Sequence, residues 1–389
     1  MTNIIILISI VIIIIFIYSY KITTKSSPLI LKPEKWFTNK KKSSIEIIGT
    51  IKISNPDKRI EVMIPEFKVE AKLLGNRRLS KFKLKTKITP NHPDMSPRED
   101  DYWQAYIVKS KSHTNINIRL NIEHKKDSNL LKQLDSIWVE IVWINYGPFG
   151  REKRLDGFVI PLTLPLDSSP NKKYLDLEDS SKITTLAIKT HKLGILDDPM
   201  KLIYNYTSEL ILPGDIVTIG ETPLAIMQGR YHHPSSLKLT YFSKLLCIFF
   251  HPTSSLATAC GMQTLINEVG VLRVIFALFI GSIFKILKVK GVFYRLAGKQ
   301  ARLIDDITGT TPPYDQMIVL GPLHSKDYCE SVSRSLGVHV AVVDVNDLGK
   351  VKVLASSKGV DLSLLKQALH SNPAGNADQQ TPIVIVRPS

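Results

Sequence analysis

The first half of the chain contains short stretches in which every second residue is hydrophobic, with many β-branched and aromatic side chains. Such alternation is typical of strands that bury one face. The predicted strands are residues 45–54, 59–74, 115–124, 136–144 and 156–164, with turns at 55–57, 75–76 and 146–148. Short strands in this number, without a helix among them, predict an antiparallel β-sandwich over residues 44–165.

The second half of the chain alternates between strand-like and helix-like patterns. Residues 166–182 are polar and predict a linker. Beyond it, strands are predicted at 183–190, 215–221, 339–345, 350–355 and 382–386, and helices at 197–207, 254–270 and 361–370. Asp197 or Asp198 would cap the first helix and Asp361 the last. This alternation predicts a mixed α/β domain over residues 183–389, which makes the whole chain an α+β multidomain protein.

Residues 4–20 form an uncharged, strongly apolar run of 17 residues. As a helix this run would be about 25 Å long, near the lower limit for crossing a bilayer. A cleaved signal peptide is the alternative interpretation, but it would begin with basic residues and end in small ones. Residues 1–3 carry no basic side chain, and Tyr18, Tyr20 and Lys21 stand where small residues would be. The pattern therefore predicts an N-terminal transmembrane helix, an uncleaved anchor, at residues 1–22.

The charge of the chain is strongly positive, with 51 Lys and Arg against 35 Asp and Glu, or +16. Lysines follow the apolar run closely, and the positive-inside rule then places the bulk of this single-pass membrane protein in the cytoplasm. The sequence has no recognisable nucleic-acid-binding signature, so nucleic acid is not a predicted partner. Three widely separated cysteines exclude a disulfide framework and fit a reducing compartment.

A second apolar run, residues 274–284, is uncharged for 11 residues between Arg273 and Lys285. It is too short to span a membrane. We interpret it first as a buried or dimer-interface helix. The alternative is a helix that lies in the membrane interface, because Arg273, Lys285, Lys288 and Lys290 could extend to lipid headgroups.

The densest series of polar positions lies in residues 186–230. Along it follow a strand, a Thr-His pair, an acidic turn, a helix, a Pro-Gly-Asp turn, a second strand, a Glu-Thr pair and a Gln-Gly-Arg turn. This order of parts resembles the gamma-glutamyl ligase family that adds glutamate to the deazaflavin coenzyme F-420. The resemblance covers about residues 183–388. It implies a homodimeric ligase that uses GTP or ATP with Mg²⁺ or Mn²⁺ to join glutamate to a small-molecule carboxylate, such as a deazaflavin.

The same resemblance implies roles for four residues. Asp305 and Asp306 correspond to the family's metal-binding Asp-Thr-x-Gly segment, although Ile307 replaces its threonine. Glu221 and Thr222 stand where the family has a Ser-Lys pair for nucleotide phosphates, so that an anion replaces a cation. The family's Asn-Ala-Gly-Ile-Asp segment, a further source of metal ligands, has no counterpart in the sequence. These departures leave open whether catalysis is retained.

Other polar positions have both a functional and a structural interpretation. His191 is either a catalytic positioning group or a hydrogen-bonded structural residue, and Arg230 either binds an anion or forms a structural ion pair. Three hydroxyls at the start of the predicted helix at 254–270 either receive phosphate or cap that helix: Thr253, Ser254 and Ser255.

Two further groups lie where ligands often bind. Asp344 comes at the carboxyl end of a predicted strand, and Asn346 and Asp347 either join it at a ligand or belong to an ordinary turn. Residues 372–378, rich in Asn, Asp and Gly, are equally suited to a turn and to a substrate loop.

The sequence therefore predicts a membrane-anchored, metal- and nucleotide-dependent amide ligase. His191 and Arg230 would be catalytic, while Asp305 and Asp306 would hold the metal. The nucleotide would contact five residues: Glu221, Thr222, Thr253, Ser254 and Ser255. The alternative is a catalytically inactive ligase-like domain that acts as a membrane-tethered binding or scaffold module. Metal-dependent nucleotide binding would distinguish the two.

Overall fold

The computed structural model describes residues 11, 15, 19, 24–41, 44–75, 79, 82–100, 102–124, 134–163, 171–176, 182–307, 312–346, 348–375 and 379–388. The anchor predicted at residues 1–22, including Tyr18, Tyr20 and Lys21, lies almost wholly outside these residues. No single helix in the described part is long and apolar enough to cross a bilayer. Helices α5 (Ala259–Val269) and α6 (Val271–Ile286) meet that test only as a pair, and they are bent by 111° at their junction.

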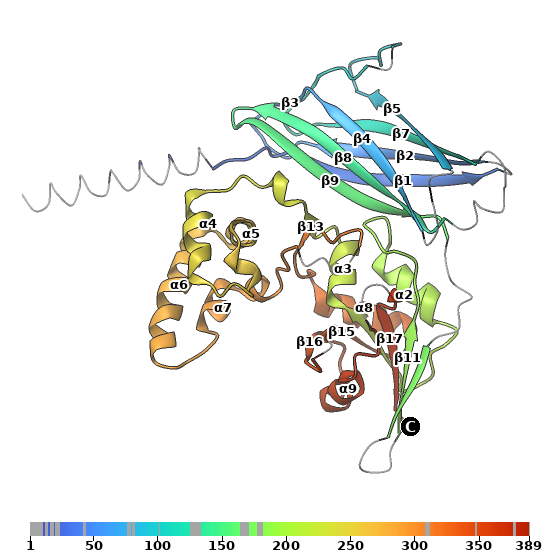
Figure 1. Ribbon diagram of the computed structural model, residues 1–389, viewed down its shortest axis with the longest axis vertical. Helices are drawn as coiled ribbons and strands as arrows, with labels where there is room; N and C mark the ends of the chain where they lie inside the picture. The colour runs from blue at the N-terminus through green and yellow to red at the C-terminus, as the bar shows by residue number, and fades with distance from the viewer. Residues whose placement is uncertain are drawn as a thin grey trace, which may run out of the picture.

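Residues 30–161 form two antiparallel sheets that share one core, here called the β-domain (Figure 1). The first sheet has the order β1 (Ile30–Lys40), β2 (Ser44–Ser54), β7 (His113–His124) and β5 (Phe82–Asn91). The second contains β4 (Phe67–Leu74), β8 (Ser136–Gly147), β3 (Val62–Ile64) and β6 (Tyr106–Val108), with β9 (Gly150–Pro161) paired to β8. The prediction of antiparallel sheets is confirmed. Strands β1, β5 and β6 were not predicted, and β1 extends the first sheet to Ile30.

Alternating residues build the core between the two sheets. The inward-facing side chains of β2 and β7 each expose 2% or less of their surface: Ile45, Ile47, Ile51, Ile53, Ile116, Ile118, Leu120 and Ile122. Trp143 and Phe158 of the second sheet complete the core. Each such side chain stabilises the fold by about 1.5–3 kcal/mol through its burial.

The second half of the chain contains a six-stranded sheet. Its order is β10 (Asn171–Asp176), β11 (Lys182–Ile188), β17 (Ile383–Pro388), β12 (Ile216–Gly220), β15 (His339–Val345) and β16 (Val351–Ser356). Strands β12 and β15 are parallel, and the other neighbours are antiparallel. The predicted linker at 166–182 therefore contains a strand, β10, that pairs with β11.

Helices cover both faces of this sheet, as the predicted α/β domain requires. Helices α2 (Pro199–Thr207), α3 (Glu221–Met227) and α8 (Ser325–Leu336) pack on one face, and α9 (Leu362–Leu369) packs on the other. Asp198 accepts hydrogen bonds from the first backbone N–H groups of α2, and Asp361 does the same for α9. Both predicted caps are confirmed.

A helical unit, residues 234–302, is inserted between β13 (Tyr231–His232) and β14 (Ile318–Val319), which pair with each other. Its helices are α4 (Tyr241–Leu246), α5, α6 and α7 (Val292–Ala297), and its 3₁₀ turns are η3 (Pro234–Ser236), η4 (Cys247–Phe249), η5 (Ser255–Ala257) and η6 (Lys299–Arg302). The apolar run at 274–284 lies within α6. Within the chain itself this helix is not buried, because only Val274 and Ala277 of α6 are buried. A dimer interface and a membrane interface both stay predictions for its exposed face.

The β-domain packs directly on the α/β domain, which lies below the β-domain in Figure 1. Trp138 and Val159 share a small apolar cluster with Ile226, Tyr314 and Met317 of the α/β domain. The rings of Trp138 and Tyr314 meet edge to face with their centroids 5.3 Å apart. The contact is thus a packed interface, not only a covalent connection.

Candidate functional site

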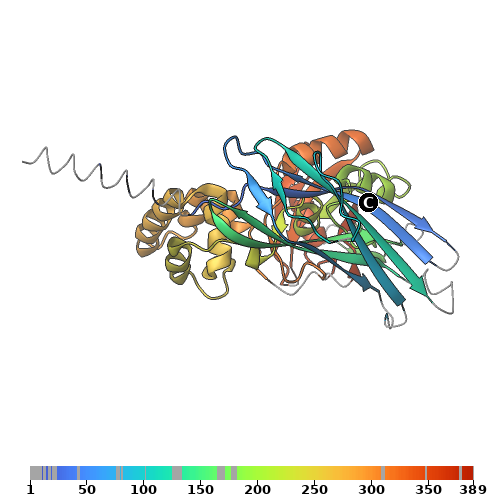
Figure 2. The same cartoon turned by 90° about the horizontal axis from the view of Figure 1, so that it is seen from above.

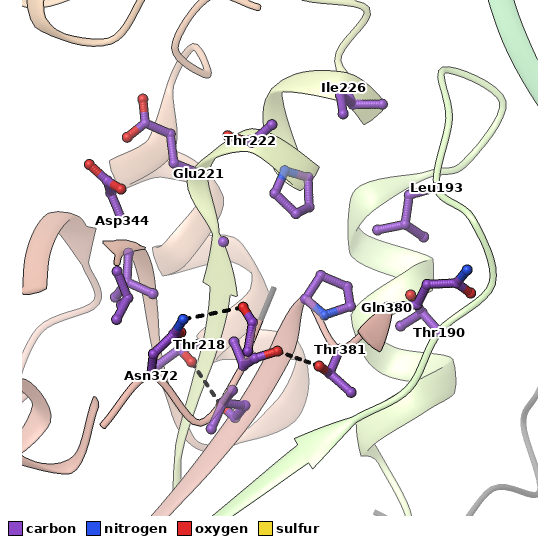
Figure 3. Close-up of a pocket in the computed structure, with 18 of the residues that line it drawn as sticks. Thr190, Leu193, Thr218, Glu221, Thr222, Ile226, Asp344, Asn372, Gln380 and Thr381 are labelled. Carbon is purple, nitrogen blue, oxygen red and sulfur yellow. Dashed lines mark hydrogen bonds between the residues drawn. The ribbon is translucent and has the colours of Figure 1, made fainter. Parts of the chain in front are cut away.

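A pocket of about 770 Å³ opens at one edge of the six-stranded sheet. Strands β11, β12 and β15 run in the same direction and end here, and β17 begins here. The carboxyl ends of parallel strands are where α/β sheets commonly bind ligands. The polar residues at these strand ends line the pocket (Figure 3): Thr190, His191, Lys192, Glu221, Thr222, Asp344, Asn346, Gln380 and Thr381.

Three carboxylates give the pocket an acidic side. Glu221 follows β12, Asp344 lies near the end of β15, and Asp305 enters from the segment that pairs with Val319. In Figure 3 the Glu221 and Asp344 carboxylates lie next to each other. Lys352 of β16 lies between them, with its Nζ 3.9 Å from Glu221 Oε2 and 3.6 Å from Asp344 Oδ2.

The environment makes two of these carboxylates unusually weak acids. Burial, together with the negative charges of Asp344 and Asp305, raises the pKa of Glu221 to about 7, although Lys352 opposes the shift. Burial and the neighbouring carboxylates of Asp344 and Asp306 raise the pKa of Asp305 to about 6. Both groups therefore exchange protons near neutral pH, which is what an acid–base group in a site must do.

Replacing Glu221 with glutamine is expected to change how stability depends on pH. The pKa of Glu221 is about 7 in the folded protein and 4.5 in the unfolded chain, so the folded state holds the proton more tightly. The stabilising contribution of this proton is fully present below pH 4.5 and is lost as the pH rises through about 7. In urea unfolding at a series of pH values, the free energy of unfolding of the wild type relative to Glu221→Gln should fall across this window. Glu209→Gln, at an exposed carboxylate, is the control. If the difference in free energy of unfolding between the wild type and Glu221→Gln stayed constant with pH, the raised pKa of Glu221 would be contradicted.

His191 lies in the pocket wall with both ring nitrogens occupied. Its Nδ1 is 2.8 Å from the Tyr206 hydroxyl and its Nε2 is 2.9 Å from Asp197 Oδ1. Only 7% of the residue is exposed. A ring held from two sides can fix the shape of the wall, but it has no free nitrogen to serve as a base, so the geometry agrees with a positioning role.

Hydrogen bonds hold the floor of the pocket. Two lie within the turn after α9, and one joins this turn to the segment before β17. Asn372 Nδ2 donates to the carbonyl of Gly375, whose own N–H donates to Asn372 O, and the Thr381 hydroxyl donates to Ala374 O (Figure 3). Asn372 of the predicted loop at 372–378 thus lines the pocket. Residues 376–378 of that loop lie outside the described residues, as does Asp347.

Five predicted site residues do not line this pocket. Arg230 forms a two-pronged ion pair with Glu268, at 2.9 and 3.3 Å. Asp306 accepts a hydrogen bond from the Thr258 hydroxyl, which itself caps α5. The remaining three form the turn before η5, where Ser254 Oγ accepts from Leu256 N–H: Thr253, Ser254 and Ser255. Arg230 and Ser254 therefore make the kind of structural interaction that was the alternative for them, an ion pair and a cap. Asp306 is held by Thr258.

The described residues do not form a preformed metal centre. Asp305 lines the pocket, whereas Asp306 accepts a hydrogen bond from Thr258 outside it, so the two do not form one site. Within the described ranges, no group of three or more His, Cys, Asp and Glu side chains is placed to hold a metal ion. The carboxylates of Glu221, Asp305 and Asp344 are ligands of the type that Mg²⁺ prefers, yet they do not converge as such a group.

Several residues in or beside the pocket were not predicted as site residues, among them Lys192, Tyr314 and Lys352. Lys192 follows His191, and its Nζ lies 3.9 Å from Asp135 of the β-domain. Lys352 lies on β16, and Tyr314 lies in the segment before β14. Strand-end position is a signal for Lys192. Lys352 and Tyr314 have no comparable local signal, because only the tertiary fold brings them to the pocket.

One comparison with known proteins concerns the β-domain. Residues 30–164 match the family model described as "F420-0:gamma-glutamyl ligase, N-terminal Ig-like domain". No curated protein matches the chain. Among solved structures, the GAE domain of GGA2p from Saccharomyces cerevisiae is 12% identical, with a TM-score of 0.22, over 36% of this chain and 95% of that one. The yeast GGA1 GAE domain is 14% identical, with a TM-score of 0.21, over the same shares.

The family model places the likeness in a different part of the chain from the one where the sequence motifs placed it. Those motifs lie in residues 183–388, whereas the model matches residues 30–164 and covers a domain for which no ligase likeness was predicted. The TM-scores of the yeast structures are too low to carry an argument. The N-terminal region of this chain is therefore Ig-like. It is similar to the Ig-like domain of F420-0:gamma-glutamyl ligase.

Proposed function

We propose that this chain is a ligase-like protein related to F420-0:gamma-glutamyl ligase, joining an amino acid to a small-molecule carboxylate such as a deazaflavin. The observation that carries the proposal is the match of residues 30–164 to the Ig-like domain of that ligase. The pocket of the adjoining α/β domain supports it, because it lies at the strand ends where α/β sheets bind ligands.

The acidic side of the pocket suits the amino-acid substrate. An ammonium group is the natural partner of the Glu221 and Asp344 carboxylates. Before the nitrogen can attack an activated carboxyl group it must lose a proton, and Glu221, with a pKa of about 7, is suited to accept it. Lys192 and Lys352 provide positive charge in or beside the same pocket for the substrate carboxylate.

GTP or ATP and Mg²⁺ or Mn²⁺ belong to the proposal through the likeness to a ligase. Activation of a carboxylate by phosphate transfer would need them, and the amine attack would follow. Among the described residues, the carboxylates of the pocket do not form a group that could hold a metal ion by itself. Homodimerisation is likewise part of the proposal through the resemblance. The N-terminal run at residues 4–20 would anchor the protein, with its bulk in the cytoplasm.

Calorimetry on the full chain in mild detergent tests the proposal. GTP and ATP would each be titrated with Mg²⁺, with Mn²⁺ and with chelator, and glutamate would then be added to the nucleotide complex. We expect micromolar, metal-dependent nucleotide binding, and glutamate binding that weakens at least tenfold in Glu221→Gln. The control is Thr253→Ala, because this hydroxyl lies outside the pocket and should leave both affinities unchanged. Absence of nucleotide binding under every condition would contradict ligase activity.

A second function, a membrane-tethered binding or scaffold module without catalysis, is favoured by two observations. Glu221 introduces a negative charge where the ligases that this sequence resembles have a cation for phosphates. Arg230 and Asp306 are occupied by Glu268 and Thr258. Binding of an amine-bearing ligand without any nucleotide would support this function instead.

A further inference from the structure

Helix α6 turns an apolar face outward. Five large side chains spaced three and four residues apart share that face, with exposed fractions from 41% to 83%: Leu272, Phe276, Phe279, Ile283 and Ile286. The opposite face packs into the protein. Val274 and Ala277 are buried there, and Gly281 lies against Phe293 of α7. A large apolar face directed away from the core marks a surface that another apolar phase covers.

The charge around this face has one sign. From residue 269 to residue 304 the sequence contains seven Lys and Arg residues and no Asp or Glu. Lys285, Lys288 and Lys290 follow one another at the carboxyl end of α6 and are exposed. A helix with a large apolar face and lysines beside it is typical of a segment that lies in the interface of an anionic membrane.

The position of the helical unit agrees with a membrane contact. It forms one end of the molecule in both views (Figures 1 and 2). Lys238, just before α4, donates from its Nζ to the backbone carbonyl of Lys25 at 3.0 Å. Lys25 follows the apolar run at residues 4–20 by only a few positions. The anchor proposed above would therefore enter a bilayer close to this unit.

A second copy of the chain is a poorer partner for this face. In a two-fold symmetric contact each copy would present the same surface to the other. The basic residues beside the two α6 helices would then face each other without an acidic residue in the segment to pair with them, and like charges across an interface are unfavourable. Anionic phospholipid supplies both the apolar phase and the negative charge.

We propose that α6 lies in the interface of an anionic membrane, with Leu272, Phe276, Phe279, Ile283 and Ile286 toward the acyl chains and the neighbouring lysines on lipid phosphates. The full chain would thus contact the bilayer at a surface separate from its N-terminal run. This contact would hold the helical unit, and with it the domain that contains the pocket, against the membrane.

The test uses full-length protein reconstituted into phosphatidylcholine vesicles with or without about one third phosphatidylglycerol. An environment-sensitive fluorophore would be attached at Phe279→Cys in a Cys260→Ser background, since Cys247 and Cys329 are buried. The matched label is Tyr204→Cys, an exposed aromatic position on α2. With anionic lipid, the label at 279 should shift its emission to the blue and be quenched several-fold more by acyl-chain-brominated lipid than the label at 204.

Charge reversal provides the second arm. Lys285→Glu with Lys290→Glu should reduce quenching at 279 by about fivefold or more, because each basic residue near an anionic surface contributes about that factor. Lys326→Glu with Lys366→Glu makes the same charge change on α8 and α9 and should have no effect. Equal quenching at 279 and 204, or a label at 279 that stays in water with anionic lipid, would overturn the proposal. So would a lipid-independent blue shift that grows with protein concentration, since a second copy would then cover α6.

Discussion

The Glu221→Gln variant should ligate about 10²–10³-fold more slowly than the wild type, because a positioned general base typically contributes a factor of that order. Glutamine keeps the size of the side chain and its place at the start of α3, but it cannot accept the proton of the attacking ammonium. The wild-type rate should rise with pH through an apparent pKa of about 7, following the raised pKa of this carboxyl. In the variant this rise should disappear. Steady-state ligation of glutamate, measured over a pH series, gives both quantities.

The matched control for this prediction is Asp344→Asn in the same acidic group. The Asp344 side chain is 51% exposed, whereas that of Glu221 is 12% exposed. A carboxylate that remains in water changes less when its charge is removed, so we expect at most about a tenfold loss. The rise of the rate with pH should remain but move to lower pH, because the charge of Asp344 helps to raise the pKa of Glu221. If Glu221→Gln retained the wild-type rate and profile, Glu221 would have no part in proton transfer.

The Trp143→Ala variant should lower the free energy of unfolding of the β-domain by about 3–5 kcal/mol, the usual cost of removing a large buried aromatic side chain. Trp143 is 1% exposed and lies in the core between the two sheets. Its Nε1 donates to Asp156 Oδ2 at 2.6 Å. Burial raises the pKa of Asp156, and the indole hydrogen bond works against that rise. The variant therefore loses packing and also removes a donor from a desolvated carboxyl group.

Trp143→Phe separates these two contributions. It keeps most of the ring volume and removes only the N–H, so we expect a cost of about 1–3 kcal/mol. Urea unfolding followed by tryptophan fluorescence is a suitable measurement, because the other three tryptophans also lie in the β-domain: Trp36, Trp103 and Trp138. A cost of the alanine variant equal to that of the phenylalanine variant would show that the cavity contributes nothing.

In the first sheet, the strands that were predicted from the sequence and those that were missed differ in their position. β2 and β7 lie in the centre of the first sheet and carry a clean alternation of isoleucines with polar residues. β1 and β5 are its two edges. Edge strands often carry lysines and prolines that prevent pairing with other chains, and these weaken the hydrophobic pattern. Lys83, Lys85 and Lys87 do so in β5, and Pro33 interrupts the register in β1.

The pocket could be predicted only in part, for a similar physical reason. Asp344 was predicted at the end of a strand, and His191 and Glu221 also follow predicted strands, since position after a strand is a local property. That these strand ends meet at one pocket follows only from the fold. Of the predicted pair Asp305 and Asp306, only Asp305 lines the pocket, and an isolated backbone bridge to Val319 holds it there. In extended backbone successive side chains point to opposite sides, so Asp305 enters the pocket while Asp306 turns to Thr258. No pattern in the sequence marks a partner that is 14 residues away (319 − 305).

The place of β17 has a consequence for how the protein is made. This strand comes last in the sequence but lies inside the sheet, paired with β11 on one side and β12 on the other. During translation, β11 and β12 therefore emerge long before the strand that joins them. The β-domain, whose strands all precede residue 162, can fold while synthesis continues, because domains fold as units from the N-terminus. The pocket is complete only once β17 has emerged, so the β-domain can be folded on the ribosome before the pocket exists.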